Sequence, residues 1–256
     1  MKVALYGDSY VDDKAILNPS TNTWITQLSS DYPTLFNYGL CGTGPDYSLQ
    51  KLRLNGGNLI IFFTGFPDRL IFPDIPHPGH SVDLSNIYYR KTPSLTLKPI
   101  LSQYAQQHST SISYLYRSIK DSLVHRTEEI LSYLSYYASI HECRIIAIPS
   151  QNPFYSHSYL RKTYIPEYIL DKLNTKYFTL YPYNIASVSR REYTPNLKSQ
   201  LQHASYVDMR QNHLSQCNHD ILYHNIIALL EKSKTLDHKY EFLDNVEQGD
   251  TYIYDD

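Results

Sequence analysis

Residues 58–64, with the sequence NLIIFFT, constrain the fold more than any other segment of the chain. The apolar run is continuous and does not alternate with polar residues, which is typical of a strand buried on both faces in a parallel sheet. Elsewhere, short apolar runs alternate with helical patterns, as they do in βαβ units. The sequence therefore predicts an α/β domain in which this segment is a central strand.

The other predicted elements follow the same alternation. Strands are expected at residues 2–6, 35–38, 58–64, 144–149 and 177–181. Helices are expected at residues 24–30, at 97–141 as one or two helices, at 165–174 and at 213–232. Residues 70–99 carry many Pro, His and Tyr without a clean period, so we expect an irregular insertion there. Residues 1–235 would form one domain, and the acidic residues 236–256 a loosely packed tail.

Composition excludes several classes of protein. A net charge of −2 lacks the basic excess of most nucleic-acid binders. Cys41, Cys143 and Cys217 are odd in number and far apart, which argues against a disulfide framework and favours a reducing compartment. No segment approaches the roughly 18 apolar residues of a membrane span, and no signal peptide is visible. We therefore expect no membrane or nucleic-acid partner, and a location in the cytoplasm or in a virus particle; the oligomeric state stays open.

A serine follows the first expected strand directly, in the tripeptide GDS at residues 7–9. In an α/β hydrolytic enzyme, a serine on such a turn is well placed to be a nucleophile. Its Oγ stands clear of the sheet, and unpaired N–H groups at the start of the next helix point to the same place. The alternative interpretation is that Ser9 is a helix N-cap and Asp8 a turn former.

A nucleophilic serine needs a base, because the pKa of its own hydroxyl is far too high. Of the eleven histidines, His213 has the most suitable position, where a loop enters the last expected helix near the carboxyl ends of the strands. His219 is expected inside that helix, with a structural role. His213 could instead cap or pack the helix, and this alternative stays open.

Three segments in order resemble conserved blocks of the SGNH (GDSL-type) hydrolases: GDS at 7–9, NYGLCG at 37–42 and HLSQCNH at 213–219. The resemblance implies a flavodoxin-like three-layer α/β/α sandwich with about five parallel strands. It also implies a serine esterase or deacylase that hydrolyses a carboxylic ester of a small molecule or a glycan, with O-acyl groups on a glycan as one candidate. Ser9 would be the nucleophile and His213 the base. The amides of Ser9 and Gly42 would form the oxyanion hole, with no metal or organic cofactor.

Two departures from the family pattern concern the groups around Ser9 and His213. The third block normally reads Gly-x-Asn-Asp, but GFPD at residues 65–68 places Pro67 where the Asn side chain would donate to the oxyanion. Arg69 is a candidate replacement donor or substrate ligand, and its alternative role is an ion pair or loop clamp.

The second departure is Arg210, which stands three residues before His213, where the family usually has Asp. Asp208 is the nearest carboxylate, and a backbone carbonyl is the other group that could orient the His213 ring. Together the departures keep open the alternative of a catalytically weak or inactive binding module with the same fold.

Overall fold

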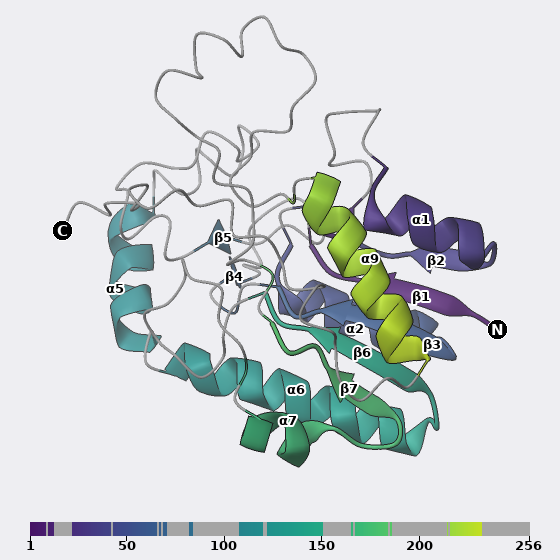
Figure 1. Cartoon of the computed structure of the whole chain (residues 1–256). Helices are drawn as coiled ribbons and strands as arrows, with labels where there is room; N and C mark the ends of the chain where they lie inside the picture. The colour runs from purple at the N-terminus through teal and green to yellow at the C-terminus, as the bar shows by residue number, and fades with distance from the viewer. Residues whose placement is uncertain are drawn as a thin grey trace, which may run out of the picture.

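Five parallel strands form one sheet in the described part of the chain, in the order β2-β1-β3-β6-β7 (Figure 1). Their bounds are β1 Val3–Tyr6, β2 Leu35–Asn37, β3 Leu59–Phe63, β6 Arg144–Ile148 and β7 Phe178–Leu180. The five expected strands are confirmed, each end within one residue. The computed structural model describes residues 1–8, 10–12, 22–41, 43–65, 67, 69–70, 82–83, 108–119, 122–150, 165, 167–183, 185, 214 and 216–231.

The strand β3 lies in the middle of the sheet, as its continuous apolar run predicts. It pairs with β1 on one side, with Leu59 opposite Val3, and with β6 on the other, with Leu59 opposite Arg144. All five residues of β3 are buried. The order places two strands on one side of the β1–β3 boundary and three on the other, which is the doubly wound arrangement of flavodoxin-like sheets.

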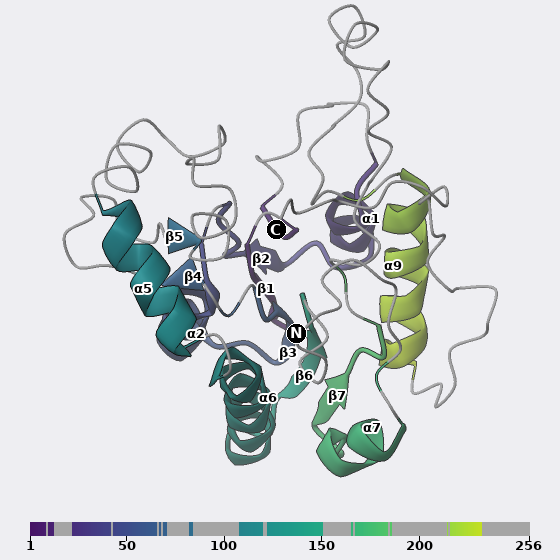
Figure 2. The same cartoon turned by 90° about the vertical axis from the view of Figure 1, so that its left-hand side faces the viewer.

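Helices cover both faces of the sheet and complete three layers (Figure 2). Helices α1 (Trp24–Asp31) and α9 (Gln216–Leu230) lie on one face, and α2 (Pro45–Asn55), α6 (Leu123–Ile140) and α7 (Glu167–Leu173) on the other. Strand residues alternate between two cores, because successive side chains point to opposite faces. Leu5, Ile61 and Phe63 belong to the α1/α9 core, and Tyr6, Ile60 and Phe62 to the α2/α6/α7 core. Burying each such side chain contributes about 1.5–3 kcal/mol.

The helix α2 was not predicted from the sequence. Pro45 opens it at the first helical position, where a missing N–H costs nothing, and Gly56 ends it with a left-handed φ of 55°. Only three of its residues are buried, Pro45, Ser48 and Leu52. With so narrow an apolar stripe, the segment between two glycine-containing turns carries little periodic signal.

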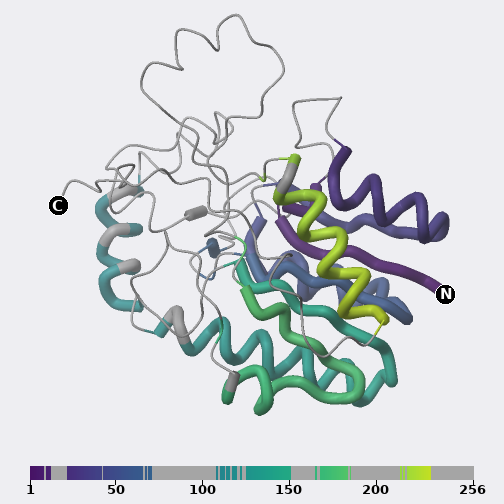
Figure 3. Tube along the Cα trace, in the orientation of Figure 1, coloured from purple at the N-terminus to yellow at the C-terminus, as the bar shows by residue number. Residues whose placement is uncertain are grey.

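The last helix, α9, is tied to the rest of the molecule at both ends. At its start, Gln216 exchanges two hydrogen bonds with the backbone of Asn22, next to α1. At its end, the Arg144 guanidinium donates to the carbonyls of Leu229 and Leu230. Figure 3 shows α1 and α9 running next to one another. His219 lies in α9 as expected, buried, and its Nδ1 accepts from the Trp24 N–H at 3.5 Å.

Other expectations were met in part. The region expected to hold one or two helices at 97–141 contains two among its described residues, α5 (Ser109–Ile119) and α6. At the start of the stretch expected to be irregular and within it, β4 (Arg69–Leu70) and β5 (Val82–Asp83) form an antiparallel pair. The rest of 70–99 and the expected tail at 236–256 lie outside the described residues. None of the helices in the described ranges is both long enough and apolar enough to cross a membrane.

Candidate functional site

The carboxyl ends of β1, β3 and β6 lie together at one edge of the sheet. Beyond β3, the Thr64 N–H donates to the Ile148 carbonyl at 3.0 Å, and the Ser150 N–H donates to Thr64 Oγ1 at 3.1 Å. Open α/β sheets bind ligands in the crevice at this edge, where the strand order reverses. In this sheet that point lies between β1 and β3, so the residues that follow these two strands are the first candidates for a site.

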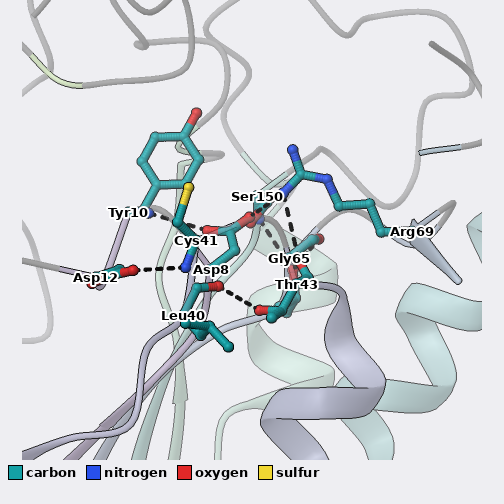
Figure 4. Close-up of polar contacts among 10 residues, drawn as sticks. Asp8, Tyr10, Asp12, Leu40, Cys41, Thr43, Gly65, Arg69 and Ser150 are labelled. Carbon is teal, nitrogen blue, oxygen red and sulfur yellow. Dashed lines mark hydrogen bonds and ion pairs between the residues drawn. The ribbon is translucent and has the colours of Figure 1, made fainter. Parts of the chain in front are cut away.

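The chain makes a closed turn directly after β1. The Asp8 carbonyl accepts from the N–H groups of Val11 and Asp12, both at 3.0 Å, and Asp8 Oδ1 accepts from the Tyr10 N–H at 3.2 Å. Gly7 is required because a Cβ there would lie 2.5 Å from Val11 Cγ2 and 2.8 Å from Phe63 Cβ. The residues on either side of Ser9 in the sequence, Asp8 and Tyr10, are therefore held by the turn (Figure 4).

A buried ion pair joins this turn to β4. Arg69 Nη1 lies 3.1 Å from Asp8 Oδ2, and the two side chains are 13% and 1% exposed. The same nitrogen donates to the Thr43 carbonyl at 3.5 Å. Since burying a carboxylate is unfavourable without charged and hydrogen-bonding partners, the guanidinium stabilises Asp8 in this buried position. Of the roles considered for Arg69, an ion pair is present, and its partner is Asp8.

The loop after β2 is bonded to the same turn. The Leu40 N–H donates to the Gly7 carbonyl at 3.1 Å, and the Cys41 N–H donates to Asp12 Oδ2 at 2.8 Å. Within the loop, Thr43 Oγ1 donates to the Leu40 carbonyl at 2.7 Å. The ends of β1 and β2 therefore carry one connected network of backbone and side-chain hydrogen bonds, and Figure 4 draws its Asp12–Cys41 and Leu40–Thr43 bonds.

Pro67 lies buried beside α6 and α2. Its carbonyl accepts from Arg126 Nη1 at 3.0 Å, while Arg126 Nη2 pairs with Asp46 at 2.6 Å. Proline has neither an N–H nor a side-chain donor, so Pro67 itself cannot donate a hydrogen bond to a ligand.

The residues predicted for catalysis divide between the described and undescribed parts of the chain. Arg69 is described and faces the turn after β1. Ser9, Gly42, Asp208 and His213 lie outside the described residues. The Asp8–Arg69 pair was not found by sequence reasoning, since no local pattern connects positions 61 residues apart. Burial raises the pKa of the Cys143 thiol, which disfavours the thiolate and argues against that cysteine as a nucleophile.

Ser150 lies at the same edge of the sheet, just beyond β6, and its side-chain hydroxyl is unpaired within the described residues. It is completely buried, and its Oγ has no hydrogen-bond partner in the structure as described. Removing an unpaired buried hydroxyl lifts a desolvation cost, so Ser150→Ala is expected to raise the free energy of unfolding by about 1 kcal/mol. The melting temperature should rise by about 2–4 °C in a scanning calorimeter. A fall in stability would contradict the assignment of the hydroxyl as unpaired.

The fold and this edge define a doubly wound α/β protein with a parallel five-stranded sheet and a network of polar groups at its switch point. No family model matches the chain, and no curated protein matches its sequence. Within the described residues, no three His, Cys, Asp or Glu side chains gather in a way that could hold a metal ion.

Proposed function

We propose that this protein is a serine ester hydrolase of the SGNH type, with Ser9 as its nucleophile. One observation carries the proposal: the buried Asp8 carboxylate, paired with Arg69, anchors a closed turn at the carboxyl end of β1. Ser9 follows Asp8 in the sequence, and the turn lies at the switch point of a doubly wound sheet. The described residues of the turn, Asp8 and Tyr10–Asp12, are buried, and a functional group needs support of this kind from the residues around it.

The proposed reaction proceeds through an acyl-enzyme. Ser9 Oγ attacks the ester carbonyl carbon while His213 accepts the hydroxyl proton, and the amides of Ser9 and Gly42 stabilise the oxyanion. Collapse of the tetrahedral intermediate expels the alcohol, which takes the proton from His213. Water then attacks the acyl-enzyme with His213 as base, which releases the carboxylic acid and restores Ser9. Asp208 or a backbone carbonyl orients the imidazole.

The polar network around the turn supports this assignment. The loop that contains Gly42 is bonded to the turn after β1 through Leu40 and Cys41, so the two segments that supply the proposed amides are held against one another. Pro67 supplies no donor, and loss of one oxyanion donor typically costs about 10²–10³ in kcat. We therefore propose a slow esterase. Its substrate class is a small-molecule or glycan ester, with O-acyl groups on a glycan as the candidate to test first.

Covalent labelling tests the proposal. The native protein is incubated with a fluorophosphonate, which phosphonylates activated serines, and the modified peptide is identified by mass spectrometry. We expect one adduct, on Ser9, and none after heat denaturation. In parallel, the wild type should hydrolyse p-nitrophenyl acetate and release acetate from an acetylated monosaccharide. A folded protein that neither reacts nor hydrolyses would instead be the non-catalytic binding module considered above.

A further inference from the structure

We propose that Arg69 is a positioning residue that aligns the two backbone donors of the oxyanion hole. This inference rests on the proposed function and assigns one more residue to the same site. It makes Arg69 neither a substrate ligand nor a donor to the oxyanion. Its guanidinium instead acts through Asp8 and Thr43, to which it is bonded.

One nitrogen of Arg69 makes both contacts. Nη1 carries two hydrogens, and it lies 3.1 Å from Asp8 Oδ2 and 3.5 Å from the Thr43 carbonyl oxygen. The first contact is a charge-assisted bond to a carboxylate that is 1% exposed, so solvent screens it little. The second is longer and joins the guanidinium to main chain. Together they bridge the turn after β1 and the loop after β2.

The sequence positions of these two partners carry the inference. Asp8 immediately precedes Ser9, and Thr43 immediately follows Gly42. The proposed hole is built from the amides of Ser9 and Gly42. A single guanidinium nitrogen is therefore bonded to the chain neighbour of each proposed donor, from two segments more than thirty residues apart. We name this three-residue unit, Asp8, Arg69 and Thr43, the Arg69 clamp.

The main chain of Arg69 is held by its own contacts, which a clamp requires. Its backbone touches the loop after β2 so closely that a Cβ on Gly44 would lie 2.2 Å from the Arg69 carbonyl oxygen. Its strand β4 pairs with β5, with Arg69 opposite Asp83. Main chain and side chain of Arg69 thus both contact residues 43–44, and the guanidinium starts from a fixed point.

The chemical consequence concerns kcat. Backbone donors stabilise an oxyanion only when they are held within about 0.5 Å and 10–20° of the productive geometry. In the proposed hole the amides of Ser9 and Gly42 are the donors, so their alignment affects the rate. A group that fixes both amides acts on the transition state and leaves ground-state substrate binding unchanged.

The test compares Arg69→Met and Arg69→Lys with a matched control, Arg126→Met. Arg126 also bonds one carboxylate and one backbone carbonyl, those of Asp46 and Pro67, but it lies outside the clamp. For hydrolysis of p-nitrophenyl acetate, we expect Arg69→Met to lower kcat by about 10²-fold with KM changed by less than about twofold. Arg69→Lys should retain part of the activity, because the ammonium keeps the positive charge but lacks the planar guanidinium, which presents several N–H donors. Arg126→Met should keep the wild-type kcat.

Two further measurements separate positioning from a general loss of structure. Low concentrations of guanidinium chloride should restore part of kcat in Arg69→Met and leave the control unchanged. The double variant Asp8→Asn/Arg69→Met replaces both charged members of the ion pair, so it should fold and remain as slow as Arg69→Met. Hydrogen exchange of the amides at residues 10–12 and 40–43 should be faster in both than in Arg126→Met.

Different outcomes overturn different statements. Wild-type kcat in folded Arg69→Met overturns the clamp and leaves the esterase proposal standing. A raised KM with unchanged kcat also overturns the clamp, because it makes Arg69 a substrate ligand. Ester hydrolysis that does not depend on Ser9 overturns the proposed function, and the clamp's catalytic role with it.

Discussion

Replacement of Ser9 by alanine is expected to lower kcat for p-nitrophenyl acetate by about 10³–10⁴-fold. Removing the nucleophile of a complete serine triad costs about 10⁶ in kcat. A wild type that lacks one oxyanion donor is itself slower by about 10²–10³, so less activity remains to be lost. The measurement is the steady-state rate of p-nitrophenol release, corrected for the spontaneous rate in buffer. His213→Ala is expected to reduce kcat by a similar factor, because base and nucleophile act as one unit.

A matched control for Ser9→Ala is Ser139→Ala. Ser139 is an exposed serine of α6 whose Oγ donates to the Ser135 carbonyl within the helix, and its replacement should leave the rate unchanged. Equal hydrolysis by Ser9→Ala and the wild type would reject the esterase mechanism. Asp208→Asn distinguishes the two ways to orient His213. A kcat far below that of the wild type supports the triad, and an unchanged kcat supports orientation by a backbone carbonyl.

Asp8→Ala is expected to destabilise the protein by about 3 kcal/mol. Removing one partner of a buried ion pair costs about 3–5 kcal/mol, and the partial exposure of Arg69 favours the lower end. The turn after β1 also loses the carboxylate that accepts from the Tyr10 N–H. The free energy of unfolding is measured by urea denaturation. Hydrolysis should fall as well, because Asp8 directly precedes the proposed nucleophile in the sequence and anchors the turn after β1.

The comparison for this prediction is Asp46→Ala. Asp46 also pairs with an arginine, Arg126 at 2.6 Å, but its side chain is 46% exposed. A pair as exposed as this contributes at most about 1 kcal/mol. A thermodynamic cycle with Asp8→Ala, Arg69→Met and the double variant isolates the coupling, and the double variant should be more stable than the sum of the single losses predicts. Equal effects of Asp8→Ala and Asp46→Ala would show that burial does not strengthen the pair.

Much of the fold could be predicted because the strands of a parallel sheet are buried on both faces. The run LIIFF of β3 and the run RIIAI of β6 are short, continuous and rich in β-branched or aromatic residues, which favours a strand in the interior of a sheet. Their ends are marked by residues that leave the apolar pattern, so strand bounds were predicted within one residue. The helix α2 carries no such signal. It is stabilised by its place against the sheet, with Pro45 and Gly56 at its ends.

The candidate site could be predicted only where it is local in sequence. A serine directly after the first strand can be recognised from nine residues, and so can a proline in place of an asparagine. The Asp8–Arg69 pair and the Thr43 contact depend on loops brought together by the order of strands in the sheet. Neither residue type nor spacing encodes that order, so the partner of Asp8 could be found only in three dimensions.

The position of α9 also has a consequence for biosynthesis. The apolar face formed by Leu5, Ile61, Phe63, Ile146 and Ile148 is shared between α1 and a helix that begins only at Gln216. While a ribosome is still making the chain, the part of this face that α9 covers is exposed, and an exposed apolar surface is a target for chaperones and for self-association. Contacts such as Asn22 with Gln216 and Arg144 with Leu230 form only once the last helix emerges. Folding of this layer therefore follows translation of α9.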